Sequence, residues 1–372
     1  ENYLAKVTVF ANGLEIDSKT YTLPSIFPGQ KGKLAISLPE YDLNDEISLL
    51  CEIQLPFDKG MLTKGHVLSY EQFIINQPKL ELMPIEGNLN CSETAWELSI
   101  CNSDMRVIID KTTGEITSIS KDNKEKLRSP IVPNFYRASI DNDKLAQVNM
   151  PLLKKLLGVY KFRDAMKKLA PKNIKVSKTD GVINVKINWK MKFLRKLVTE
   201  YQIGNDEIGF SMRVIGRRPL IRYGFTFATR EDVKEMEFYA KGPFENYCDR
   251  STAALLKNYK GVAEDFIHDY FYPQENGNHT EARYLNLGGE KEGMAILAEE
   301  KPFEFSVHPY TLEMLDRAQH LHELNRLNYY TVNIDGRQRG VGGDMPAIAM
   351  LKKQYKILPK EEHKLKFRMI LK

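Results

Sequence analysis

The sequence lacks several features that would identify a function at once. Its 372 residues include only four cysteines, Cys51, Cys91, Cys101 and Cys248, and none of their spacings is typical of a metal site. We expect free buried thiols, and a pairing of Cys91 with Cys101 across neighbouring strands is the alternative. The cysteines therefore leave the redox compartment open.

A long apolar run and a strong charge excess are also missing. No run of 18 apolar residues occurs, so we expect no membrane-spanning helix. With 54 basic and 49 acidic residues the net charge is +5, which by itself does not indicate nucleic acid. The densest basic stretch, 154–178, has apolar residues at roughly helical spacing. It predicts either an amphipathic helix that covers a sheet edge or, as the alternative, a helix that binds a membrane or nucleic acid.

Familiar enzyme motifs are absent as well. The sequence has no phosphate-binding loop that ends in Lys-Ser/Thr, no G-x-S-x-G and no H-E-x-x-H. The glycine-rich run 340–343 precedes Asp344 rather than a helix, which disfavours a dinucleotide site. His320 and His322 would face one side of a strand and could ligate a metal, but the preceding Asp316-Arg317 favours a helix or loop over a strand.

What the sequence does have is apolar residues that alternate with polar ones. With 42% hydrophobic residues, the chain can bury a large core. Apolar residues recur at every second position in several segments, which predicts half-buried strands: 5–9, 34–38, 47–55, 183–191, 208–214 and 221–227. No strand–helix–strand alternation is evident. We therefore predict an all-β chain, with a partial immunoglobulin-like β-sandwich at 1–78 and a large two-sheet sandwich at 79–372.

Compact polar clusters bracketed by aromatics are the best candidates for a site. They lie at 137–143, 242–250 and 272–277. Carboxylate, amide and guanidinium groups suit sugar hydroxyls, and aromatic faces suit the C–H surface of a sugar ring. The alternative is that the same groups hold long loops together. The candidate residues are Arg137, Asp141, Asn142, Asp143, Glu245, Asn246, Arg250, Glu275 and Asn276.

Four strings in these regions carry a family resemblance. They are R-A-S-I-D-N-D (137–143), G-P-F-E-N-Y-C-D-R (242–250), P-Q-E-N-G (273–277) and N-I-D-G-x-x-x-G-V-G-G-D (333–344). In order and approximate spacing they are similar to motifs of the C-terminal domain of glycoside hydrolase family 2 β-galactosidases. Residues 1–78 resemble the immunoglobulin-like domain that precedes it. The resemblance implies that 79–372 form a supersandwich of the galactose mutarotase type.

The resemblance also implies what the chain does not contain. The complete bacterial enzyme would hydrolyse terminal β-D-galactosides such as lactose with retention, through two Glu residues on a (β/α)8 barrel that also holds Mg²⁺. That barrel lies outside this chain. We therefore expect no catalytic residue, metal or cofactor here, and an inactive piece of a longer polypeptide that packs on the barrel. We expect neither nucleic acid nor a membrane as a partner. Whether the chain forms a homo-oligomer, and whether it resides in the cytoplasm or the periplasm, is left open.

A role at the mouth of the active site is the function that this resemblance implies. In the family the loop after D-N-D, here 144–150, lies near that mouth, and a Trp that stacks on sugar follows G-G-D. This sequence has Met345-Pro346 at the position of that Trp, which puts direct stacking of a side chain on the sugar in doubt. By their position, Asp344 and Met345 are added to the candidates for residues near the substrate.

Two alternatives use the same fold. A free-standing aldose epimerase needs a His–Glu acid–base pair, for which His268, His279 and His308 with Glu245 or Glu275 are the material. A plain carbohydrate-binding module needs only an exposed sugar site.

Overall fold

The computed structural model describes residues 2–143, 160–230, 234–289, 293–342 and 351–372. The chain divides into two compact units, one of residues 1–79 with 255–258 and one of 80–254 with 259–372. Every strand pairing among the described residues is antiparallel. The all-β prediction is therefore confirmed.

The first unit contains one four-stranded sheet, whose strands in spatial order are β2 (Leu14–Thr22), β1 (Leu4–Ala11), β3 (Ile47–Gln54) and β4 (Val67–Asn76). The β1–β2 turn uses Asn12 and Gly13, both at positive φ, as a tight hairpin requires. The strand predicted at 34–38 is wrong, because no strand is assigned between Thr22 and Ile47. Alternation alone does not make a strand where the main chain finds no partner to pair with.

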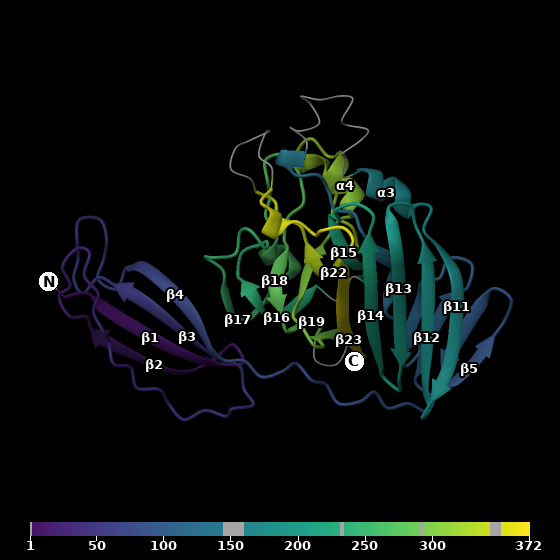
Figure 1. The fold of residues 1–372 in the computed structure, drawn as a ribbon, viewed down its shortest axis with the longest axis horizontal. Coiled ribbons are helices and arrows are strands. Elements are labelled where there is room, and N and C mark those ends of the chain that lie inside the picture. The colour runs from purple at the N-terminus through teal and green to yellow at the C-terminus, as the bar shows by residue number, and fades with distance from the viewer. Residues whose placement is uncertain (1, 144–159, 231–233, 290–292, 343–350) are drawn as a thin grey trace. The chain divides into compact units, whose positions relative to one another are not determined.

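The second unit is a sandwich of two large sheets (Figure 1). The ten-stranded sheet has, in spatial order, β18 (His279–Ala282), β21 (Phe303–His308), β22 (Tyr329–Gln338), β15 (Arg222–Arg230), β10 (Leu127–Asn134), β8 (Ile116–Lys121), β7 (Met105–Asp110), β6 (Glu97–Cys101) and β5 (Asn90–Glu93), with β9 (Lys124–Glu125) beside β8.

The nine-stranded sheet has, in spatial order, β11 (Ala170–Thr179), β12 (Val182–Lys190), β13 (Leu194–Ile203), β14 (Glu207–Gly216), β23 (Glu362–Leu371), β20 (Met294–Ala298), β19 (Tyr284–Leu287), β16 (Glu235–Gly242) and β17 (Leu255–Val262). The short helices are α3 (Tyr160–Met166), α4 (Leu312–Arg317) and the 3-10 turns η2 (Ala263–Phe266), η3 (Leu321–Glu323) and η4 (Lys353–Tyr355).

Aromatic side chains fill the space between the two sheets. Phe210 of β14 stacks on Phe367 of β23 at a centroid distance of 4.7 Å, and Phe225 of β15 meets Phe210 edge-on at 5.5 Å. All three are almost fully buried. Because strand side chains alternate, this packing turns the intervening residues of β15, β21 and β22 to the other face of the ten-stranded sheet.

The helix predicted in the basic stretch 154–178 is only partly present. Residues 144–159 lie outside the described residues, α3 is short, and 170–179 form the edge strand β11. Lysines and a proline are typical of an exposed sheet edge, where they prevent pairing with another chain, and the same residues resemble the polar face of a helix. No helix in the described residues is long and apolar enough to cross a membrane.

Candidate functional site

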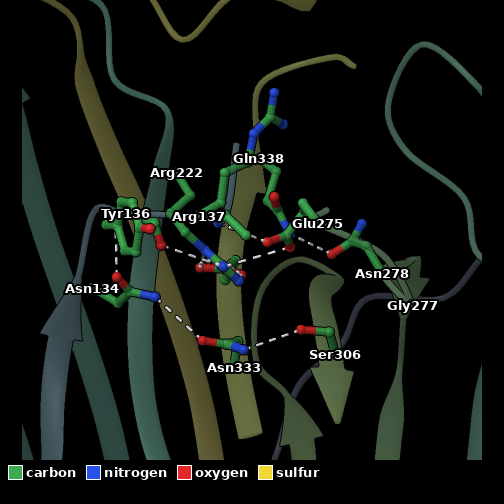
Figure 2. A network of polar contacts seen from close by, with 12 residues as sticks. Asn134, Tyr136, Arg137, Arg222, Glu275, Gly277, Asn278, Ser306, Asn333 and Gln338 are labelled. Carbon is green, nitrogen blue, oxygen red and sulfur yellow. Dashed lines mark hydrogen bonds and ion pairs between the residues drawn. The ribbon is translucent and has the colours of Figure 1, made fainter. Parts of the chain in front are cut away.

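The face of the ten-stranded sheet that points away from the core is polar, yet it is buried. β21 contributes Glu304, Ser306 and His308, and β22 contributes Asn333 and Asp335. All five are at most 7% exposed, because the motif-bearing loops lie over this face. Buried polar groups of this kind need partners, and Figure 2 shows Asn333 bonded to Ser306 on one side and to Asn134 on the other.

Arg222 is the central cation of this network. Its Nε lies 3.0 and 3.1 Å from the two carboxylate oxygens of Asp335, and its Nη1 lies 3.7 Å from Glu275 Oε1. Burial lowers the pKa of Arg222, but Asp335 and Glu275 outweigh burial and raise it overall. Burial raises the pKa of Asp335 to about 6 although Arg222 opposes it, so the pair remains ionised at neutral pH.

Gln338 links this centre to a second buried acid. Its Nε2 donates to Glu275 Oε1 (3.2 Å) and to Asn278 Oδ1 (2.9 Å), and its main-chain N–H donates to Glu304 Oε2 (3.0 Å) (Figure 2). Burial raises the pKa of Glu304 to about 7, since the main-chain hydrogen bond only partly compensates. Glu304 therefore holds a proton over part of the physiological pH range.

The residues just after β22 are held by two of the sequence motifs. Arg137, fully buried, donates to the carbonyl oxygens of Arg339 (2.8 Å) and Gly340 (3.3 Å). Asn142 Nδ2 donates to the carbonyl of Val341 at 2.9 Å. Asp143 accepts a hydrogen bond from the Arg339 guanidinium.

Asp249, from the next motif, holds the opposite side of the same backbone. Its two carboxylate oxygens accept the N–H groups of Val341 (3.0 Å) and Gly342 (2.8 Å). A Cβ at Gly340 would lie 2.3 Å from Asp249 Oδ2, so only glycine fits beside the carboxylate. The segment 339–342 is thus held by two motif loops at once.

The side chains of Glu245 and Asn246 form hydrogen bonds within their own loop and with residues 277–280. Glu245 Oε1 accepts hydrogen bonds from Arg250 and from the Tyr270 hydroxyl, and its Oε2 accepts the Gly277 N–H at 2.8 Å. Asn246, fully buried, uses its amide to donate to Lys241 O and Phe244 O and to accept from Thr280. Both residues have their hydrogen-bonding capacity met by protein groups.

The His–Glu pair that an aldose epimerase requires is not assembled. His308 Nε2 lies 2.9 Å from the main-chain oxygen of Asn276 and must donate to it, and burial lowers the pKa of His308 to about 4. The ring of His279 faces the carbonyls of Lys241 and Phe266. His268 stacks edge-on against Tyr270. The structure therefore gives the epimerase alternative no support.

The predicted site residues divide into buried and accessible groups. Arg137, Glu245, Asn246, Glu275 and Asn276 are buried, so they shape the loops from within. Asp141 is exposed, and its Oδ2 accepts a hydrogen bond from Gln274 Nε2 at 3.1 Å. Asn142 and Asp143 are partly exposed, and the Arg250 side chain is 52% exposed. Asp344, Met345 and the loop 144–150 lie outside the described residues.

Several residues of the network were missed from the sequence: Arg222, Asn278, Glu304 and Gln338, with Asp335 noticed only as part of a motif. A signal existed, because Glu304 and Ser306 alternate with Phe303, Phe305 and Val307 in β21. In a half-buried strand the polar residues at every second position ordinarily face solvent, and only the fold reveals that loops cover these.

No cluster of metal-ligating side chains is found among the described residues. No group of three or more His, Cys, Asp or Glu side chains among them lies close enough to hold one. His320 precedes the turn η3 and His322 lies within it, and their rings stack at 5.5 Å. All four cysteines are free, and the register sets Cys91 opposite Ile100 and Cys101 opposite Asn90, which places the two thiols on opposite faces.

Structural comparison finds galactose mutarotase-like proteins that are about 7–11% identical to this chain. A galactose 1-epimerase from Lactobacillus acidophilus has a TM-score of 0.41 and 10% identity, covering 78% of this chain and 99% of that one. A putative aldose 1-epimerase from Escherichia coli K12 has a TM-score of 0.38 and 9% identity, covering 76% and 99%. Likenesses with such low scores carry no argument here.

Sequence comparison is more informative. The β-galactosidase of Halalkalibacterium halodurans is 27% identical over 366 residues, which cover 92% of this chain and 34% of the relative. The β-galactosidase of Actinobacillus pleuropneumoniae is 27% identical over 98% of this chain and 35% of the relative. The chain thus spans about a third of the length of these relatives. The model of the family described as beta galactosidase small chain matches residues 101–371. The chain belongs to the β-galactosidase small-chain family.

Proposed function

We propose that this chain is the non-catalytic β portion of a retaining β-galactosidase, and that its motif loops form part of the rim of the active site. In this proposal the two catalytic Glu residues and any Mg²⁺ belong to a (β/α)8 barrel in the rest of the enzyme, on which this unit packs. The substrate class is terminal β-D-galactosides. Support comes from the relatives, which are β-galactosidases of about three times the matched length.

The observation that carries the proposal is the fixing of residues 339–342 by two motif loops. A rim built this way is rigid, because its hydrogen bonds are formed by buried or partly buried groups before substrate arrives. Rigid groups beside a catalytic centre exclude water and orient a sugar without taking part in bond cleavage. Asp141 and Arg250, which remain accessible, are the groups we assign to contact with substrate or with the barrel.

Two measurements test this role. The 372-residue chain alone should not hydrolyse a chromogenic β-galactoside, and turnover by it would refute the proposal. In the Halalkalibacterium halodurans enzyme, this chain should replace the matching third with hydrolysis retained. Within that chimaera Asp141→Ala should raise KM or lower kcat, whereas Asp58→Ala, in the first unit, should change neither. A folded chimaera that is inactive, or one indifferent to Asp141, would argue against a rim role.

A further inference from the structure

A cavity of about 330 Å³ lies on the polar face of the ten-stranded sheet, beside the two short helices. It is lined by residues of β10, β15 and β22 and by Met166 of α3 and Leu312 of α4. α3 and α4 are joined by the ion pair between Arg163 and Asp316, at 3.3 Å. A volume of this size is at the lower end of the range for small-molecule sites.

Three hydroxyl groups line this cavity without a protein partner. Ser129 of β10, Thr226 of β15 and Thr331 of β22 are buried or half-buried, and none makes a side-chain hydrogen bond to another described residue. The strand register explains the space between them, because Ala228 stands opposite both Ser129 and Thr331 and its small side chain forms the floor. Hydroxyl groups that line a cavity and have no protein partner are available to a ligand.

The remaining lining is suited to a neutral ligand with both hydroxyl groups and C–H faces. Asn134, 1% exposed, is held in one orientation by Asn333 (3.2 Å) and the Tyr136 N–H (2.9 Å). Tyr136 and Tyr329 supply aromatic rings. Arg128, which lies 5.6 Å from the centre of the Tyr329 ring, and Glu313 carry opposite charges, so the lining is electrically balanced.

We propose that this cavity binds one small neutral polyhydroxy molecule of monosaccharide size. The hydroxyls of Ser129, Thr226 and Thr331 would bond its hydroxyl groups, and the tyrosine rings would contact its carbon skeleton. The three hydroxyl groups lie away from the segment 339–342, since Thr331 precedes Arg339 by eight residues of extended chain, roughly 26 Å. At the other side of the cavity Tyr136 directly precedes the motif residue Arg137. The inference does not depend on the proposed rim role, because none of the three hydroxyl groups belongs to a motif loop.

The experiment uses D-galactose as the probe and the whole 372-residue chain. Heteronuclear NMR titration should show saturable shifts of the Ser129, Thr226 and Thr331 amides, with a dissociation constant of about 1 mM. D-galacturonate, which carries a negative charge, should bind at least tenfold more weakly. Shifts confined to Asp141, Asn142 or Arg250 would place the sugar at the motif loops and overturn the proposal, as would the absence of saturable binding.

Variants separate the cavity from a general effect on the fold. Thr226→Val combined with Thr331→Val removes two hydroxyls at nearly constant volume and should weaken D-galactose binding about tenfold. Thr179→Val, at an exposed position of β11, is the matched control and should bind as wild type. Ala228→Val narrows the cavity and should weaken binding independently. Unchanged affinity in the double variant and in Ala228→Val, with spectra that show both folded, would refute the site.

Discussion

Arg222 and Asp335 form a bidentate ion pair between two adjacent strands, β15 and β22, with both side chains fully buried. The pairing register is irregular between Tyr223 and Gly224, and Gly224 stands opposite Asp335. A Cβ at Gly224 would lie 2.4 Å from Asp335 Oδ1, so the glycine leaves the room that the carboxylate occupies. Glu275, which belongs to one of the motif loops, contacts Arg222 and so links the loops to this ion pair.

Removing the cation should be strongly destabilising. Arg222→Met leaves Asp335 and Glu275 buried without their counter-ion, which typically costs about 3–5 kcal/mol. Urea unfolding of the whole chain measures the loss. Lys196→Met is the matched control, because its ion pair with Glu362 is partly exposed and should contribute at most about 1 kcal/mol. Equal losses in both variants would contradict the central role of Arg222.

Glu304 should make stability depend on pH. Its pKa is raised to about 7 in the folded chain, so the folded state binds a proton that the unfolded state has released, and the Glu304 contribution to stability falls as pH rises from about 4.5 to 7. Glu304→Gln mimics the protonated form. Relative to wild type, the variant should therefore gain about 3 kcal/mol of unfolding free energy between pH 5 and pH 8. Glu235→Gln, at an exposed position, is the matched control for the loss of one carboxylate, and a gain as large as that of Glu304→Gln would contradict the role of burial.

The contribution of His308 to stability should depend on pH in the opposite direction. Burial lowers its pKa to about 4, so its stabilising contribution is complete above about pH 6.5 and is lost as pH falls towards 4. Ring nitrogen chemical shifts should show a single neutral tautomer protonated at Nε2 at pH 7, because Nε2 faces the Asn276 oxygen. The midpoint should lie below pH 5, with the signal assigned by its loss in His308→Gln. Titration near pH 6.5 would contradict this burial.

Asp249 should control the opening of the backbone after β22. Asp249→Ala removes the acceptor of two N–H groups, so amide exchange of Val341 and Gly342 should accelerate about tenfold or more. Asp110→Ala is the matched control, since Asp110 accepts the N–H groups of Thr112 and Thr113 in a turn elsewhere. Its variant should leave exchange at 341–342 unchanged. If Asp249→Ala also leaves it unchanged, the carboxylate does not hold this segment.

The sequence predicted the strands best where they are half-buried. Alternation located β1, β12 and β14 because one face of each packs on a core and the other does not. It failed at 34–38, where alternation is present but no strand pairs with the segment. It also failed at β11, where lysines on a sheet edge resemble a helix surface. Pairing depends on distant residues, which a local pattern does not contain.

For the candidate site, the motifs identified the loops but not what lies beneath them. Asp141 and Arg250 were found because polar residues cluster around them in the sequence. Arg222 and Glu304 lie in strands, outside these polar clusters, and the alternation around Glu304 in β21 predicts only a half-buried strand. Their importance arises from burial under loops more than 20 residues away along the chain, which only the folded structure reveals.

The fit between Gly340 and Asp249 has a consequence for protein engineering. The carboxylate of Asp249 occupies the space where a side chain at position 340 would begin. A substitution at either position therefore requires a matching substitution at the other. Arg137 and Asn142 extend this dependence to a third stretch of sequence. Transplanting a single one of these loops from one of the relatives would separate groups that fit only as a set, so grafts should move all three.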